Sequence, residues 1–144
     1  SGVALLNVPE RKLELSTLAF PALLDYLRTC KYECGSFVVV VEAGWLEAKS
    51  NFHPYHGRRA EKIAKDVGRN QETGRKIAEM CRYWGIDVVE HHPLRKMWKG
   101  PGRKITHAEL AYFTGITGRT NQETRDAALI AWAYAGLPIR MNVR

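Results

Sequence analysis

The feature that most constrains this chain is a run of five apolar residues, Phe37 to Val41, that ends in the carboxylate of Glu42. We expect a strand made of Phe and Val to be buried on both faces, as strands are when helices cover a sheet from both sides. A carboxylate at the carboxyl end of such a strand lies where ligands bind in open α/β sheets. Glu42 is therefore a candidate ligand-binding residue.

A second acidic group, Glu123 and Asp126, opens the last helical segment. Residues three apart share a helix face, so both carboxylates can point at one ion. Three converging carboxylates in a chain of net charge +7 suggest a bound cation. Hard oxygen ligands favour Mg²⁺, with Mn²⁺ as a substitute, which indicates phosphate-ester chemistry. A purely structural explanation stays open, because Glu123 also fits a T-x-x-E capping box starting at Thr120, and the helix dipole favours an acid near position 126.

Composition narrows the class of partner. A chain of 144 residues with 45% hydrophobic content can form one globular domain, residues 1–144, with a two- or three-layer core. The excess of 22 Lys and Arg over 15 Asp and Glu favours a polyanionic partner, a bias that ribosome-bound and membrane-surface proteins share. No apolar run approaches the roughly 20 residues of a membrane span, and no signal peptide is visible. We expect a cytoplasmic protein without a membrane partner.

Cys30 and Cys34, followed by His53 and His56, raise the alternative of a zinc site. The spacings C-x3-C and H-x2-H depart from the usual finger pattern, and the apolar strand lies between them. An odd number of cysteines without a secretion signal fits reduced thiols better than disulfides. We interpret these residues as ordinary core thiols and loop histidines.

Apolar periodicity and turn residues predict alternating strands and helices. The expected elements are a hairpin of strands 2–7 and 12–20, a helix starting at Pro21, the strand 37–42, one long or once-broken helix from about 58 to 84 stopped by Gly85, a strand 86–90, a basic loop 91–105, and two terminal helices behind T-x-x-E boxes at Thr106 and Thr120, the last ending at Gly136 and Pro138. This order predicts an α/β layered domain with a mixed sheet, in which helical connections imply parallel neighbours.

The long helix carries apolar and small positions that alternate in steps of four and three, from Ile63 to Trp84. Such positions belong to the core more often than to an interface, yet the heptad-like spacing leaves room for contact with a two-fold mate. Asn70 and Gly74 interrupt the apolar stripe. They would permit close approach either to the sheet or to a partner.

The basic loop is the strongest candidate for polyanion contact, because five of the ten residues from 95 to 104 are basic. These are Arg95, Lys96, Lys99, Arg103 and Lys104. Trp98 lies among them, and Gly100 and Gly102 give flexibility, a composition that suits phosphate backbones more than base edges. Lys96 could also neutralise charge that develops on a reacting phosphate, although a solvated loop lysine is the structural alternative.

Motifs along nearly the whole chain carry a resemblance to one family. They are Gly2-Val-Ala-Leu-Leu, Val39-Val-Val-Glu42, Gly68-Arg-Asn-Gln-Glu-Thr-Gly74, Gly85-Ile-Asp-Val-Val-Glu-His-His-Pro93, Lys96, Gly100-Pro-Gly-Arg-Lys-Ile-Thr106 and Arg125-Asp-Ala-Ala-Leu-Ile-Ala131. Their order and spacing resemble the RuvC family of Holliday junction resolvases. The resemblance implies an RNase H-like three-layer fold with a mixed central sheet, a homodimer, and Mg²⁺-dependent symmetrical nicking of four-way DNA junctions in recombination and repair.

By position, the resemblance makes Glu42 the family's second acidic residue and makes Glu123 and Asp126 its terminal pair. These carboxylates would serve hydrolysis with two metal ions roughly 3.5 to 4 Å apart, with Lys96 near the scissile phosphate. Trp45 matches the position from which the family presents an aromatic side chain to the junction centre, where it could stack on a base. The alternative is a ring folded onto the core.

The family's first catalytic aspartate lies in a G-x-D-x-G motif on the central strand, just before the segment that Ser1-Gly2-Val3 resembles. No residue from 1 to 7 is acidic. Either the sequence lacks a strand that the whole protein has, or the chain is a diverged member whose metal site is incomplete. A protein that binds branched DNA without cutting it, and an RNase H-like nuclease for RNA, are the alternative functions. A sheet without its central strand would expose two unpaired edges and be less stable.

Overall fold

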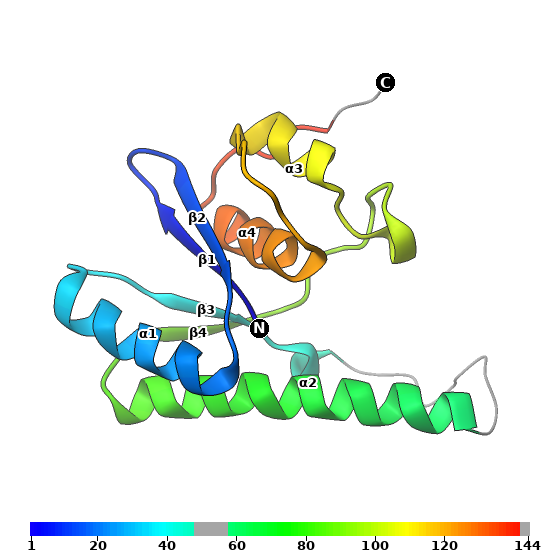
Figure 1. Cartoon of the computed structure of the whole chain (residues 1–144), viewed down its shortest axis with the longest axis horizontal. Helices are drawn as coiled ribbons and strands as arrows, with labels where there is room; N and C mark the ends of the chain where they lie inside the picture. The colour runs from blue at the N-terminus through cyan, green and yellow to red at the C-terminus, as the bar shows by residue number, and fades with distance from the viewer. Residues whose placement is uncertain (48–57, 142–144) are drawn as a thin grey trace. The chain divides into compact units, whose positions relative to one another are not determined.

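The computed structural model describes the backbone of residues 1–47 and 58–141 and the side chains of residues 1–47 and 69–141. It is an α/β structure (Figure 1) with strands β1 (Gly2–Asn7), β2 (Lys12–Thr17), β3 (Val39–Glu42) and β4 (Val88–His91), helices α1 (Phe20–Glu33), α2 (Arg58–Tyr83), α3 (His107–Thr114) and α4 (Gln122–Tyr134), and 3-10 turns η1 (Gly44–Leu46) and η2 (Pro101–Arg103). The chain divides into two compact units: unit 1 comprises Ser1–Leu23 and Leu94–Arg144, and unit 2 comprises Leu24–Pro93. The single domain inferred from composition stays a prediction.

Unit 1 begins with the predicted hairpin, in which β1 and β2 pair antiparallel with Gly2 opposite Thr17. The side chain of Asn7 accepts a hydrogen bond from the backbone N–H of Glu10 at 3.2 Å, which stabilises the turn between the strands. The second strand ends at Thr17, earlier than predicted, because the chain has already entered α1 at Phe20.

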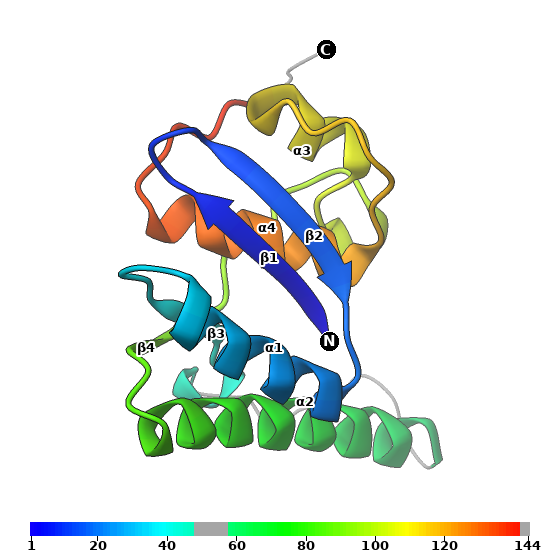
Figure 2. The same cartoon turned by 60° about the vertical axis from the view of Figure 1, so that its left-hand side comes forward.

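Helix α4 packs along one face of this hairpin, as Figures 1 and 2 both show. Alternation along β2 exposes Lys12 and Glu14 and turns Leu13 and Leu15 inward. The two leucines pack against the buried core of the unit. Its members are Trp98, Ile105, Leu110, Ala128 and Leu129. The core therefore joins the N-terminal hairpin to residues that follow unit 2 in the sequence.

Unit 2 contains the parallel pair that the helical connection predicted, with Val39 opposite Val88 and α2 packed against both strands. The strand β3 is shorter than the expected 37–42, and among its apolar residues only Val41 is buried. The prediction of a strand buried on both faces is therefore wrong for the described residues, because Val39 and Val40 stay half-buried. These residues form two separate two-stranded sheets, since no strand bonds to both pairs as one mixed sheet would require.

Helix α2 is one unbroken helix of 26 residues, and Gly85, with a φ of 72°, follows its end as predicted. Its buried positions include Gly74, Ala78 and Cys81, whereas Asn70 is exposed. Neither α2 nor any other helix in the described part of the chain combines the length and the apolar character needed to cross a membrane.

The predicted capping box at the start of α3 is confirmed. The Thr106 hydroxyl accepts from the backbone N–H of Glu109, and the Glu109 carboxylate accepts from the backbone N–H of Thr106. Gly115, with a φ of 73°, ends the helix in the left-handed conformation that glycine tolerates.

The predicted box at the start of α4 is wrong, because Asn121 and not Thr120 is the capping residue. The Asn121 side chain accepts from the backbone N–H of Thr124 at 2.9 Å. The Thr120 hydroxyl instead accepts from Arg125 Nη1 at 3.1 Å. Glu123 is thus not needed to cap the helix, which removes one structural explanation for an acid at that position.

Candidate nucleic-acid and metal-binding site

Residues 98–104, here called the basic hairpin, form an ordered tight turn within the predicted basic loop. The backbone N–H of Trp98 donates to the carbonyl of Arg103 at 3.0 Å, and that of Gly100 donates to the carbonyl of Lys104 at 2.9 Å. A Cβ at Gly100 would lie 2.4 Å from the Lys104 oxygen. Glycine at position 100 therefore serves close backbone approach, in contrast to the flexibility expected from the sequence.

The indole of Trp98 anchors this hairpin in the core of unit 1. Trp98 is only 6% exposed, and its ring stacks on Phe113 with centroids 6.1 Å apart. A tryptophan that the sequence places among cations is thus a core residue. The cations of the basic hairpin, Lys99, Arg103 and Lys104, therefore lie on a backbone segment that is anchored in this core.

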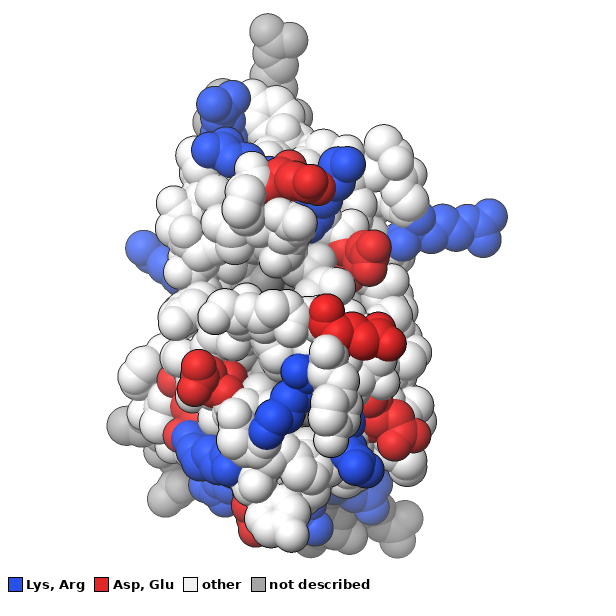
Figure 3. Space-filling model, turned by 90° about the vertical axis from the view of Figure 1, so that its left-hand side faces the viewer, with Lys and Arg blue, Asp and Glu red and all other residues white. Residues whose placement is uncertain are grey.

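All the lysine and arginine side chains of residues 95–104 are exposed. They are Arg95, Lys96, Lys99, Arg103 and Lys104, and all belong to unit 1. The face shown in Figure 3 carries acidic and basic side chains interspersed. Five of the ten residues from 95 to 104 are Lys or Arg, compared with 22 of 144 in the whole chain. Positive charge is therefore concentrated in this segment of the sequence.

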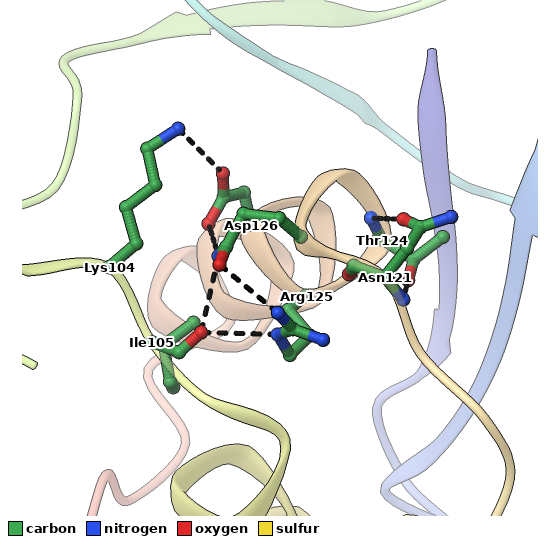
Figure 4. A network of polar contacts seen from close by, with 7 residues as sticks. Lys104, Ile105, Asn121, Thr124, Arg125 and Asp126 are labelled. Carbon is green, nitrogen blue, oxygen red and sulfur yellow. Dashed lines mark hydrogen bonds and ion pairs between the residues drawn. The ribbon is translucent and has the colours of Figure 1, made fainter. Parts of the chain in front are cut away.

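The end of the basic hairpin is bound to the first turns of α4 (Figure 4). The carbonyl oxygen of Ile105 accepts from Gln122 Nε2 at 3.2 Å and from Arg125 Nε at 3.1 Å. Asp126 Oδ1 accepts from Gln122 Nε2 at 2.9 Å, and Asp126 Oδ2 lies 3.8 Å from Lys104 Nζ. Both oxygens of Asp126 therefore have protein partners, although each oxygen keeps a further lone pair that could bind a metal ion.

Glu123 lies in the first turn of α4 with an exposed side chain. Within the part of the chain that the structure describes, its carboxylate makes no hydrogen bond or ion pair. Its backbone is tightly packed, because a Cβ at Gly2 would lie 2.3 Å from the Glu123 carbonyl carbon. Only glycine at position 2 lets β1 start so close to this turn.

Glu42 ends β3 as predicted, and its side chain is exposed. It stands opposite His91 in the parallel register, and nearby in sequence His92 Nδ1 lies 3.0 Å from Glu47 Oε1. Glu42 belongs to unit 2, whereas the acidic residues of α4 belong to unit 1. The convergence of the three carboxylates on one ion therefore stays a prediction.

Trp45 follows Glu42 in η1 and packs on α2. A Cβ at Gly74 would lie 2.8 Å from Trp45 Cζ3 and 3.6 Å from Val41 Cγ1, so this glycine permits close approach of the helix to η1 and β3. The Arg75 guanidinium lies over the indole, 5.4 Å from its centroid. Base stacking by Trp45 stays a prediction, and it requires a ring face that Arg75 does not cover.

The cysteines are free thiols, as predicted, with Cys30 and Cys81 buried and Cys34 half-buried. Burial raises the pKa of Cys30, and the adjacent Cys34 thiol raises it further; burial also raises the pKa of Cys81. His53 and His56 lie outside the described residues. Within residues 1–47 and 69–141, no group of three or more His, Cys, Asp and Glu side chains could hold a metal ion.

Comparisons of this chain with protein-family models, with curated proteins and with solved structures found no match.

Proposed function

We propose that this protein is a structure-selective endodeoxyribonuclease of the RuvC type, which resolves four-way DNA junctions by Mg²⁺-dependent phosphodiester hydrolysis. The observation that supports this most is the connection between the basic hairpin and α4. Lys104 Nζ lies 3.8 Å from Asp126 Oδ2, and two α4 side chains hold the carbonyl of Ile105. Cations for a phosphate backbone beside carboxylates for a metal are what phosphodiester hydrolysis requires.

The residues proposed to hold the metal are Glu42, Glu123 and Asp126, whose hard carboxylate oxygens match the chemistry of Mg²⁺ or Mn²⁺. When bound, such an ion would supply Lewis-acid chemistry for activating water and for stabilising the leaving oxygen. The exposed ammonium of Lys96 would neutralise charge on the scissile phosphate. The cations Arg95, Lys99, Arg103 and Lys104 would hold the flanking DNA backbone.

We propose that the protein acts as a homodimer, because two symmetrical nicks in a two-fold junction need two sites related by a two-fold axis. We also propose that it acts in the cytoplasm. Trp45 would stack on an unpaired base near the junction centre. Its ring in the free protein is half-buried beneath Arg75.

The test is Mg²⁺-dependent nicking of an end-labelled four-way DNA junction. Matched duplex DNA and structured RNA serve as competitors, and Glu42→Gln serves as the inactive control. We expect symmetrical nicks that Glu42→Gln abolishes without loss of junction binding. If Glu42→Gln still nicks the junction, Glu42 is not part of the catalytic site. If the protein cuts RNA in preference to DNA, its substrate is RNA.

A second candidate is a branched-DNA-binding protein that does not cut. The observation in its favour is that both carboxylate oxygens of Asp126 already have protein partners, Gln122 and Lys104. The same assay separates the two functions, because tight, selective junction binding without nicks at any Mg²⁺ or Mn²⁺ concentration supports this candidate.

A further inference from the structure

We infer that Glu109 is a positioning residue, which holds the basic hairpin in its phosphate-binding conformation before DNA arrives; this inference rests on the proposed function. The Glu109 side chain is only 8% exposed, although it carries a carboxylate. Its Oε1 atom accepts three hydrogen bonds: from the backbone N–H of Lys99 at 3.0 Å, from that of Thr106 at 3.1 Å, and from the Thr106 hydroxyl at 3.0 Å.

The bond from Lys99 sets Glu109 apart from an ordinary capping residue. A capping box requires only that the carboxylate reach back to the backbone N–H of the capping residue, which is Thr106. The donor at Lys99 lies ten residues before Glu109 and contributes nothing to the cap. One buried oxygen therefore connects the start of α3 to the first cation of the basic hairpin.

The hairpin needs such a connection because its backbone is strained. Arg103 has a φ of 61°, in the left-handed region that a residue with a Cβ enters at a steric cost. The carbonyl of Arg103 accepts from the backbone N–H of Trp98, whose indole is buried in the core. Trp98, Glu109 and the α4 contacts to Ile105 together oppose relaxation of Arg103.

Charge and positioning predict opposite effects of removing Glu109. A carboxylate beside a cationic hairpin repels phosphates, so its loss should strengthen DNA binding if only charge matters. If Glu109 positions the hairpin, its loss leaves Lys99 and Arg103 to be ordered when DNA binds, and that ordering weakens binding. The sign of the change in affinity therefore separates the two.

The experiment compares three variants for binding to a four-way junction and to matched duplex DNA. Glu109→Ala should bind both DNAs about tenfold more weakly, as expected when one or two long side chains must be ordered on binding. Glu109→Gln keeps an acceptor oxygen and loses the repelling charge, so it should bind at least as tightly as the wild type. Thr106→Ala is the matched control, because it removes the hydroxyl from the cap of α3 and from Glu109 Oε1 but keeps both backbone donors to that oxygen, the N–H groups of Lys99 and Thr106.

Hydrogen exchange at the Lys99 amide gives a second readout that needs no DNA. Exchange should accelerate in Glu109→Ala and stay near the wild-type rate in Glu109→Gln and Thr106→Ala, with α3 still protected in all three. Unchanged exchange at Lys99 in Glu109→Ala would overturn the inference.

The two proposals can fail separately. Equal or tighter DNA binding by Glu109→Ala, when the wild type nicks junctions, overturns the inference and leaves the proposed nuclease standing. A wild type that binds duplex DNA but never nicks a junction overturns the nuclease, and a loss of duplex binding in Glu109→Ala then still supports the positioning role. A wild type that binds neither DNA overturns both.

Discussion

Lys104 Nζ lies 3.8 Å from Asp126 Oδ2, so the last cation of the basic hairpin is the partner of the second carboxylate of α4. The two side chains are 44% and 33% exposed, and ion pairs this accessible contribute about 0 to 1 kcal/mol to stability. The pair can therefore open at little cost. A metal ion could take the place of the ammonium at Asp126, and Lys104 would then be available to a phosphate.

Replacing Asp126 with Asn should abolish Mg²⁺-dependent nicking and preserve junction binding. The amide cannot supply a charged metal ligand, whereas the cations that bind the backbone are untouched. The free energy of unfolding should change by less than about 1 kcal/mol, because the asparagine oxygen can still accept from Gln122 and only the accessible ion pair with Lys104 is removed. Nicking and urea denaturation measure the two effects. Asp25→Asn, an exposed change on α1, is the control, and full cutting by Asp126→Asn would exclude Asp126 from catalysis.

Replacing Lys99 and Arg103 with Ala should weaken DNA binding and flatten its dependence on salt. Each side chain that no longer binds a phosphate should reduce the slope of log affinity against log salt concentration by about one. Lys12→Ala, an exposed change on β2 in the same unit, should leave the slope unchanged. Binding titrations over a series of salt concentrations give the slopes, and parallel lines for the double variant and the wild type would refute the basic hairpin as the DNA-binding element.

Replacing Gly74 with Ala should destabilise the protein, although alanine normally stabilises a helix interior by roughly 0.5 to 1 kcal/mol relative to glycine. The new methyl group would lie 2.8 Å from Trp45 Cζ3, and overpacking of this kind costs about 1 to 3 kcal/mol. Urea denaturation reports the sign. Glu79→Ala, at an exposed position of α2, should be nearly neutral. A more stable Gly74→Ala would contradict the close packing of Trp45 on α2.

Cys34 should be the only thiol that reacts quickly with an aromatic disulfide reagent in the native protein. Cys81 is fully buried and Cys30 nearly so, and burial raises the pKa of both, which lowers their thiolate content. The fast phase should vanish in Cys34→Ser. Two fast thiols in the wild type would be inconsistent with the burial of Cys30.

The same pKa shifts predict the direction of a pH effect. Because both buried thiols have raised pKa values in the folded state, the unfolded chain loses protons first as the pH rises through about 8.5. Their contribution to stability is complete below that pH and declines above it. Replacing Cys81 with Ala should reduce the decline, as measured by urea denaturation between roughly pH 7 and 10.

Elements whose signals are local could be predicted from the sequence. The hairpin of β1 and β2, the full length of α2 and the Thr106 capping box follow from alternation, periodicity and turn residues within short windows. The box at Thr120 fails because Asn121 is an equally good capping residue one position later, and only the backbone geometry decides between them. The starts of β3 and β4 shift for a related reason, since the apolar residues Phe37, Val38 and Ile86 precede the first paired positions, Val39 and Val88.

The contacts that organise the candidate site were not visible in the sequence. The bond from Lys99 to Glu109 and the packing of Trp45 on Gly74 join residues with no periodic relationship. Glu109 carried one signal, the capping box, which explains its place on α3 and says nothing of the hairpin. Side chains that act through long-range contacts leave no short pattern for sequence reasoning to detect.

The division of unit 1 into two stretches of sequence has a consequence for how the protein folds. Unit 2 is continuous in the sequence, and its strands pair Val39 with Val88, whereas the bond from Asn121 to Thr17 in unit 1 spans 104 residues. Closing so long a loop costs chain entropy, and distant contacts slow folding. The face of the β1–β2 hairpin that α4 covers therefore stays exposed to solvent until α4 has been synthesised and has packed against it. The helix that completes the core also carries Glu123 and Asp126, so the acidic pair is in place only once unit 1 is complete.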